Sequence, residues 1–430
     1  MVKLMSNIEN FISILTTTEK KLLSQLYYLR TLNIEQAYDF CAVPNTDVSN
    51  INEFVAISVT KLAKANYIEV IPFNCNFIMF LTPDGIEAVR LILNLPTSIV
   101  HPQNGNVSRG YYRASELKLK DRLINHQLHL NQFLLQFESF YKKYELDDEY
   151  EYFDEKHLSV YREIRPDGLL RFKDFDLFLE MDMGTESKKQ LIAKWEHYRK
   201  YLTKSAYLNP NHRPMIIFFI CEGTSRIIER KDLVSKTSHD TLGYLFSEKF
   251  EIYTGSSSSL LKLFFEQLFP YMKNKNNSVH HVRILLQEFH DFELYRVNQI
   301  IPDGLTGNYS LYLRRTCQET GVVSDMLFDD WRLGQISILT NIAFLSKNSF
   351  LIKQYLGVDY RYLILIDDLN KTHTVLSQAH LLTHSKVLFT TVERLKDLPF
   401  HQAVFVMTEN REIHSFKDEE LKHLVFEKQF

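Results

Sequence analysis

The sequence has few cysteines, and none of them is spaced for metal binding. Its 430 residues include Cys41, Cys75, Cys221 and Cys317, with no CxxC pair. Isolated cysteines favour a reducing compartment and argue against a zinc site. The chain also has no apolar run near the roughly 20 residues of a membrane span, and its start has no signal core. We therefore expect a cytoplasmic protein without a membrane partner.

An excess of charge of one sign and several binding motifs are also absent. The formal net charge is only −3, and the sequence contains no Walker loop and no GxGxxG motif. Neither ATP nor dinucleotide binding is therefore indicated. The closely spaced histidine pair of rolling-circle relaxases is missing too. Any binding of nucleic acid must come from local basic patches, because the whole chain is not basic.

The most informative feature that is present is an acidic hairpin. A Pro-Asp-Gly turn at 166–168 opens two short apolar strands, and the register of the hairpin places Asp167 opposite Glu180. Alternation puts Asp182 on the same face. Opposed like charges destabilise a sheet, so this face needs a proton, a cationic side chain or a metal. The three carboxylates have the chemistry to hold Mg²⁺ or Mn²⁺, while acidic side chains that simply face solvent are the alternative.

A basic segment follows the hairpin. The residues after Gly184 predict a loop and then a helix that carries Lys188, Lys189 and Lys194, among other cations. Carboxylates beside a cationic helix suit a phosphodiester substrate. We therefore expect Lys188 and Lys189 to contact DNA.

The runs Glu163 to Gly168 and Phe178 to Ser187, with Lys194 and Tyr198, resemble the replication-relaxation family of Gram-positive plasmids and mobile elements. The resemblance extends to the start of the chain and to Val387 to Thr391. It implies a role in plasmid replication or in relaxing plasmid DNA for transfer.

The same core resembles the PD-(D/E)xK nuclease fold, with Asp167 and Glu180 at its two acidic positions. That fold has a lysine two residues after the glutamate, where this chain has Asp182. Lys194 is a candidate migrated substitute, because it lies four residues before Tyr198 on one helix face. The resemblance thus implies Asp167, Glu180, Asp182 and Lys194 as catalytic residues, with the displaced lysine weakening the case for catalysis.

The first hundred residues predict a winged helix-turn-helix. Helical spacing indicates a helix after Thr16, a second over Ile34 to Cys41 and a third over Asn50 to Ala65, followed by a strand hairpin and a closing helix. Winged helices place the third helix in the major groove of DNA. Use of this domain for dimerisation or protein contacts is the alternative. The DNA-binding residues expected in and after this domain are Asn52, Thr60, Lys61, Lys64, Arg109 and Arg113.

The fold class predicted for the chain is multidomain α/β, with the winged helix followed by two tandem restriction-endonuclease-like units. The predicted domains are residues 1–100, a linker and long helix over 101–150, a first α/β unit over 151–275, and a degenerate second copy over 280–430. The alternative is a chance likeness of two α/β segments.

The duplication is based on a second Pro-Asp-Gly at 302–304 and on the acidic pair Asp329-Asp330. Aligning Gly334 with Gly184 puts Asp330 at the position of Glu180 and Arg332 at the position of Asp182. An inserted loop is expected around Thr306 to Asp325.

Together these features predict a DNA-binding protein of a plasmid or mobile element that acts in replication initiation, relaxation or mobilisation. Its nuclease-like domain grips DNA and need not cut it. A metal-dependent site-specific endonuclease or nickase is the first alternative, and a winged-helix transcription regulator is the second. The expected partners are double-stranded DNA, other replication or relaxosome proteins, and a second copy of the chain in a homodimer.

Overall fold

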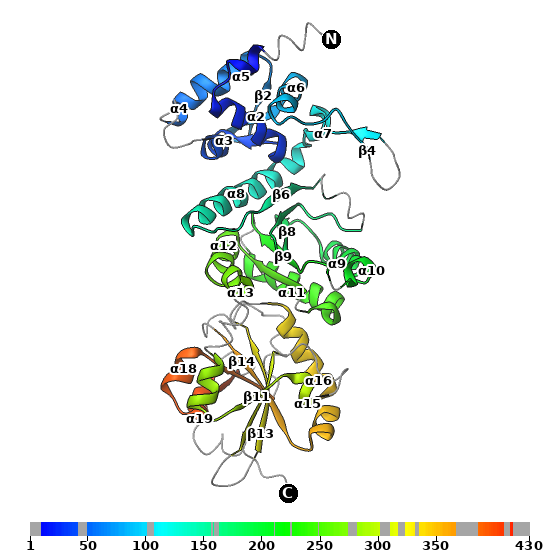
Figure 1. Cartoon of the computed structure of the whole chain (residues 1–430), viewed down its shortest axis with the longest axis vertical. Helices are drawn as coiled ribbons and strands as arrows, with labels where there is room; N and C mark the ends of the chain where they lie inside the picture. Colours follow the sequence, from blue (N-terminus) through cyan, green and yellow to red (C-terminus); the bar gives the residue numbers. More distant parts are fainter. Residues whose placement is uncertain are drawn as a thin grey trace. The chain divides into compact units, whose positions relative to one another are not determined.

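The protein divides into two compact units, unit 1 (Met1–Asp147) and unit 2 (Asp148–Phe430), each of mixed α/β structure (Figure 1). The long helix predicted over 101–150 belongs to unit 1. No helix in the part of the chain described is long and apolar enough to cross a membrane. The computed structural model describes residues 10–41, 50–100, 107–155, 158, 163–209, 211–223, 226–247, 249–273, 282–301, 310–316, 323–331, 335–366, 386–407 and 413–415.

Unit 1 places helices against a small antiparallel sheet of order β1-β3-β2. Its elements up to the closing helix are α2 (Thr17–Leu29), β1 (Leu32–Asn33), α3 (Ile34–Cys41), α4 (Ile51–Phe54), the π-helical η1 (Val55–Val59), α5 (Thr60–Lys64), β2 (Ile68–Phe73), β3 (Asn76–Leu81) and α6 (Pro83–Ile92). The predicted succession of three helices, a hairpin and a closing helix is confirmed.

Local capping explains where these helices begin. Thr16 and Glu19 form a reciprocal capping box at the start of α2, and the Asn50 side chain accepts a hydrogen bond from the Glu53 N–H at the start of α4. The segment from α4 to α5 buries Phe54, Ser58 and Leu62, which recur at helical spacing.

The rest of unit 1 is more ordered than predicted. In the expected linker, β5 (Val107–Arg109) pairs with β4 (Ser98–Val100), which lies just before that linker, and the short helix α7 (Ala114–Leu117) follows. The long helix predicted in this segment is α8 (Asp121–Lys143).

In unit 2, the first sheet has the order β10-β9-β8-β7-β6. Its strands are β6 (Glu151–Asp154), β7 (Gly168–Arg171), β8 (Asp176–Asp182), β9 (Met215–Cys221) and β10 (Phe250–Gly255). The strand pairs β6–β7 and β7–β8 are antiparallel, while β8–β9 and β9–β10 are parallel. Strand β6 lies in the acidic stretch between α8 and the hairpin, and main-chain pairing with β7 holds it at the edge of the sheet.

Helices cover both faces of this sheet (Figure 1). Its helices are α9 (Lys188–Leu202), α10 (Ser205–Leu208), α11 (Ile227–Leu242), α12 (Ser257–Leu263), η4 (Phe264–Leu268) and α13 (Phe269–Lys273). Trp195 of α9 packs on Phe219 of β9 on one face, and Phe264 of η4 packs on Phe218, the preceding residue of β9, on the other. This alternation follows from the period of two along a strand.

The second sheet of unit 2 has the order β11-β12-β13-β14-β15-β16-β17. Its strands are β11 (Glu293–Tyr295), β12 (Leu311–Thr316), β13 (Val323–Asp330), β14 (Tyr360–Leu365), β15 (Val387–Thr390), β16 (Phe405–Met407) and β17 (Ile413–Ser415). Around them lie η5 (Leu285–Phe289), α15 (Val297–Ile300), α16 (Ser337–Leu356), α18 (Val392–Asp397) and α19 (Phe400–Ala403). One continuous apolar core contains residues of both sheets, including Trp195 and Trp331.

The first five strands of the second sheet repeat the order and the senses of the first sheet. Pairs β11–β12 and β12–β13 are antiparallel, and β13–β14 and β14–β15 are parallel. The strand order that the predicted duplication requires is therefore present.

Residue pairing gives the alignment of the two sheets, and it differs from the predicted one. Leu311 pairs with Phe328 as Gly168 pairs with Leu179. The equivalent of Glu180 is therefore Asp329, not Asp330. Likewise Ser310, and not Asp303, takes the position of Asp167; residues 302–304 and Arg332 lie outside the described residues. The predicted insertion is also wrong in part, because β12 lies inside it.

The same alignment equates a charged cross-strand pair in each sheet. Arg171 Nε donates to Asp176 Oδ1 at 3.1 Å in the first sheet, and Arg314 Nε donates to Asp325 Oδ1 at 2.8 Å in the second. Both aspartates are buried. Each arginine also faces a glutamate on the preceding strand, Glu151 in the first sheet and Glu293 in the second. This three-residue correspondence was not apparent from sequence spacing.

Candidate functional site

The predicted acidic hairpin forms with the predicted register. Leu169 pairs with Phe178 and Arg171 with Asp176, which places Asp167, just before β7, opposite Glu180 of β8. Asp167 Oδ2 accepts a hydrogen bond from the Met181 N–H at 2.7 Å. Like charges thus meet on a face where Glu180 is buried and needs compensation.

Helix α9 supplies that compensation. Lys194 Nζ lies 2.9 Å from Glu180 Oε2, and the Tyr198 hydroxyl donates to Glu180 Oε1 at 2.5 Å. These residues sit one helical turn apart, so both reach the same carboxylate. The predicted pairing of Lys194 and Tyr198 on one helix face is confirmed.

Burial and charge act against each other at this carboxylate. Burial raises the pKa of Glu180 to about 7, and Asp167 adds to the rise while Lys194 and the Tyr198 hydroxyl oppose it. Burial by itself would lower the pKa of Lys194, but Glu180, Asp167 and Glu186 outweigh it and raise that pKa. Lys194 is therefore a permanent cation held among acidic groups, and Glu180 can gain a proton near neutral pH.

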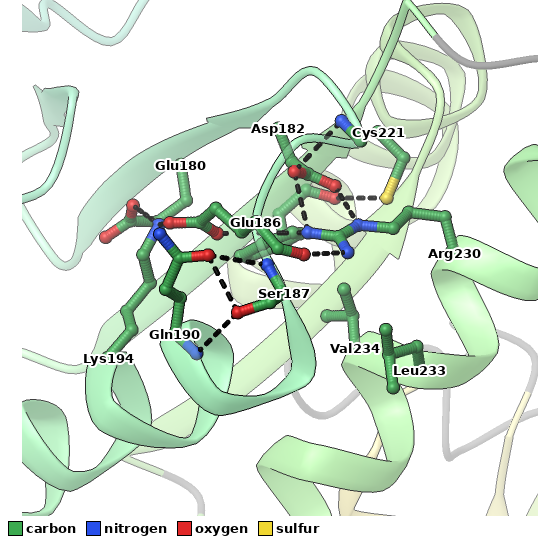
Figure 2. Close-up of polar contacts among 12 residues, drawn as sticks. Glu180, Asp182, Glu186, Ser187, Gln190, Lys194, Cys221, Arg230, Leu233 and Val234 are labelled. Carbon is green, nitrogen blue, oxygen red and sulfur yellow. Dashed lines mark hydrogen bonds and ion pairs between the residues drawn. The ribbon is translucent and has the colours of Figure 1, made fainter.

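Asp182 is engaged by another cation. Arg230 of α11 donates hydrogen bonds to both oxygens of the Asp182 carboxylate, from Nη2 to Oδ1 at 2.8 Å and from Nε to Oδ2 (Figure 2). The two side chains are almost fully buried, at 8% and 1% exposure. A planar fork of this kind matches a carboxylate in both distance and direction.

Glu186 belongs to the cluster although the sequence did not single it out. Its Oε1 lies 3.1 Å from Lys194 Nζ, and its main-chain carbonyl accepts from Arg230 Nη1 at 2.6 Å. The capping box of Ser187 and Gln190 begins α9 directly after it, as Figure 2 shows. The capping signal Ser187-x-x-Gln190 could have fixed the position of Glu186 one residue before the cap.

The arrangement does not fit the predicted three-carboxylate metal site. Glu180 is bound by Lys194 and Tyr198, and both oxygens of Asp182 are bound by Arg230. Among the residues described, no group of three or more His, Cys, Asp or Glu side chains is placed to hold a metal ion. A guanidinium and an ammonium thus take the role of the counter-charge, one of the three options that the sequence left open. Binding of Mg²⁺ or Mn²⁺ stays a prediction.

In the second sheet, the carboxylate equivalent to Glu180 is that of Asp329, and neutral groups donate hydrogen bonds to it. Asp329 accepts from the Ser310 hydroxyl at 2.6 Å, from Asn341 Nδ2 at 2.9 Å and from the Tyr362 hydroxyl. Burial raises the pKa of Asp329 to about 6, and these hydrogen bonds oppose the rise. Hydroxyl and amide groups have therefore replaced the lysine that serves Glu180.

The residues predicted to contact DNA divide into exposed and engaged side chains. Asn52, Lys64, Arg113, Lys188 and Lys189 are exposed.

Three others already have partners within unit 1. Lys61 lies 2.9 Å from the buried Glu19, Arg109 lies 3.3 Å from Glu116, and the Thr60 hydroxyl donates to the Val55 carbonyl. Lys61 was predicted on a solvent face, but its ammonium compensates a carboxylate whose side chain is fully buried. Two further cations, Lys120 and Arg122 at the start of α8, are also exposed.

Comparison with known proteins gives one match, to a protein family. Residues 76–214 match the model of the family described as Replication-relaxation. The matched segment runs from β3 of unit 1 to the residue before β9, and Val387 to Thr391 lies outside it. No curated protein and no solved structure matches the chain. The family suggests a role in plasmid replication or relaxation. Residues 76–214 are thus similar to the replication-relaxation family.

Proposed function

We propose that the chain is a DNA-binding protein of a plasmid or mobile element that acts in replication initiation, relaxation or mobilisation. The observation that carries this proposal is the extent of the family match. The polar cluster of unit 2 consists of side chains that surround the buried carboxylates of β8: Asp167, Glu180, Asp182, Glu186, Lys194, Tyr198 and Arg230. Residues 76–214 include β3 of unit 1 and every member of this cluster except Arg230. The matched segment therefore contains most of the cluster of unit 2 as well as part of unit 1.

We assign the winged helix-turn-helix and its DNA contacts to unit 1. The order of three helices, a two-stranded hairpin and a closing helix supports this assignment. Asn52 and Lys64 are exposed on the third helix, and Arg113, Lys120 and Arg122 are exposed after the hairpin. Lys61 is left out of the DNA contacts because it neutralises Glu19.

We assign the cluster in unit 2 a role in holding DNA without cleaving it. An internal ammonium and guanidinium already neutralise its carboxylates, so the exposed Lys188 and Lys189 at the start of α9 meet the phosphates. Lysines in the first turn also add to the positive end of a helix.

A metal-dependent nickase is the second candidate. The observation in its favour is that Lys194, displaced along the sequence, reaches Glu180 and lies within electrostatic range of Asp167. These three residues are the ones that the resemblance to the PD-(D/E)xK fold brings together. Under this candidate Asp167 and Glu180 would bind a divalent ion only after Lys194 moved away from Glu180.

One experiment separates the two candidates. Supercoiled plasmid is incubated with the purified full chain in Mg²⁺, in Mn²⁺ and in EDTA, and binding is measured on the same DNA. The role in holding DNA predicts salt-dependent binding with no relaxed product under any condition. Relaxed product that requires a divalent ion and is lost on Glu180→Gln would replace it with the nickase. Absence of DNA binding at low salt would remove both.

A paired set of variants tests which residues meet phosphate groups. Replacing Arg113 and Lys120 by alanine should lower the log-log salt slope of binding by about 0.9 for each phosphate that the variant no longer neutralises. The matched control replaces Lys142 and Lys143, which are exposed at the far end of α8. Equal slopes for the two double variants would contradict the assignment to unit 1.

A further inference from the structure

Arg230 makes several polar interactions that the packing of α11 alone does not require. Its guanidinium binds both oxygens of Asp182 and the main-chain carbonyl of Glu186, and Nη2 lies 3.9 Å from Glu186 Oε2. The side chain is 8% exposed, so these bonds form away from bulk water. Figure 2 shows the guanidinium pointing from α11 toward the strand end and the loop before α9.

Without this arginine the end of β8 would carry uncompensated negative charge. Asp182 is 1% exposed in its side chain and lies two residues from Glu180 on the same face. Lys194 cannot serve it, because its ammonium is bound by Glu180 and Glu186. A buried carboxylate left without a counter-charge is strongly unfavourable.

The second sheet gives an internal comparison. Asp329 is the equivalent of Glu180, so the position two residues further on, equivalent to Asp182, is Trp331. This tryptophan is buried and donates its indole N–H to the Gln335 carbonyl. Where the carboxylate is replaced by an indole, no cation is needed at that point of the sheet.

We propose that Arg230 is a positioning residue that takes the place of a metal ion at Asp182. It neutralises that carboxylate, fixes the loop from Gly184 to Ser187 through the Glu186 carbonyl, and so leaves Lys194 to Glu180 and Glu186. The proposal goes beyond the proposed function, since this charge compensation exists with or without DNA.

The test uses the full chain and three variants: Arg230→Gln, Asp182→Asn and the double variant. Thermal unfolding is followed in EDTA and in about 5 mM Mn²⁺. Each single variant should lose roughly 10 °C in EDTA, because one partner of a buried pair is left behind. The double variant should recover at least half of the loss from Arg230→Gln, since both charges are gone.

Manganese supplies a result that a merely structural role would not produce. Arg230→Gln frees the carboxylate of Asp182 and removes the cation 3.9 Å from Glu186 Oε2, so Mn²⁺ should raise its melting temperature by a few °C more than that of the wild type. The double variant should lose this extra response. Arginine at 230 in the wild type should keep the response small.

Three outcomes would overturn the proposal. The first is that the losses of the two single variants simply add in the double variant. The second is that Arg230→Gln folds but responds to Mn²⁺ no more than the wild type. The third is that neither Arg230→Gln nor the double variant folds. Arg230 would then be needed for a reason other than its pairing with Asp182.

Discussion

Replacing Glu251 by glutamine should make the stability of unit 2 less dependent on pH. Glu251 lies in β10, yet its Oε1 accepts from the Ile252 N–H at 2.9 Å and from the Ser337 N–H at 3.3 Å. Ser337 begins α16, which has no side-chain cap of its own. The carboxyl group of the first sheet therefore caps a helix of the second sheet.

The magnitude follows from the shifted pKa. Burial raises the pKa of Glu251 from the ordinary 4.5 to about 7, although the hydrogen bonds from Ser337, Ile252 and Ile336 oppose the rise. A carboxyl with a raised pKa in the folded state contributes stability that is fully present below pH 4.5 and is lost as the pH rises through 7. A shift of this size corresponds to at most about 3 kcal/mol in the free energy of unfolding.

The assay is denaturant unfolding of the full chain at several pH values between 5 and 8.5, followed by circular dichroism. Glu251→Gln keeps the acceptor oxygen but does not titrate, so its stability should fall less over this range than that of the wild type. Glu229→Gln on the exposed side of α11 is the matched control and should follow the wild type. Parallel pH profiles for the wild type and Glu251→Gln would refute the reasoning.

Four further substitutions test the other interactions by the free energy of unfolding. Tyr198→Phe removes a hydroxyl from the buried Glu180 and should cost about 1–3 kcal/mol. Arg171→Ala and Arg314→Ala each remove the arginine from one of the two equivalent Arg–Asp pairs, and each should lower the free energy of unfolding by a similar amount, about 1–3 kcal/mol. A loss for only one of the two variants would argue against the equivalence of the pairs. Lys61→Met should destabilise unit 1 by about 1–3 kcal/mol, because it leaves Glu19 without the lysine ammonium. DNA affinity at a fixed salt concentration should stay within about twofold of the wild type. A larger loss of affinity would identify Lys61 as a phosphate-binding residue after all.

Sequence alone determined part of the local structure of this chain. The register of the acidic hairpin follows from alternation and a short loop, so Asp167 opposite Glu180 could be placed before any tertiary contact was known. Helical spacing likewise placed α3 over Ile34–Cys41. Lys194 and Tyr198 could be assigned to one helix face because four residues complete about one turn.

Tertiary structure decided which groups compensate the carboxylates. Arg230 stands 48 residues after Asp182, and no local pattern links a strand end to a helix so far along the chain. The same limit explains why Lys61 was expected in solvent, since its partner Glu19 belongs to another helix.

The alignment of the two sheets was decided in the same way. Spacing of Pro-Asp-Gly and of glycines suggested Asp330, whereas main-chain pairing assigns Asp329 to the position of Glu180. Shifting the alignment of a strand by one residue exchanges its two faces. The predicted alignment therefore selected the half-exposed Asp330 in place of the buried Asp329. Hydrogen bonding between strands fixes that register, and those bonds form only when distant segments of the chain meet.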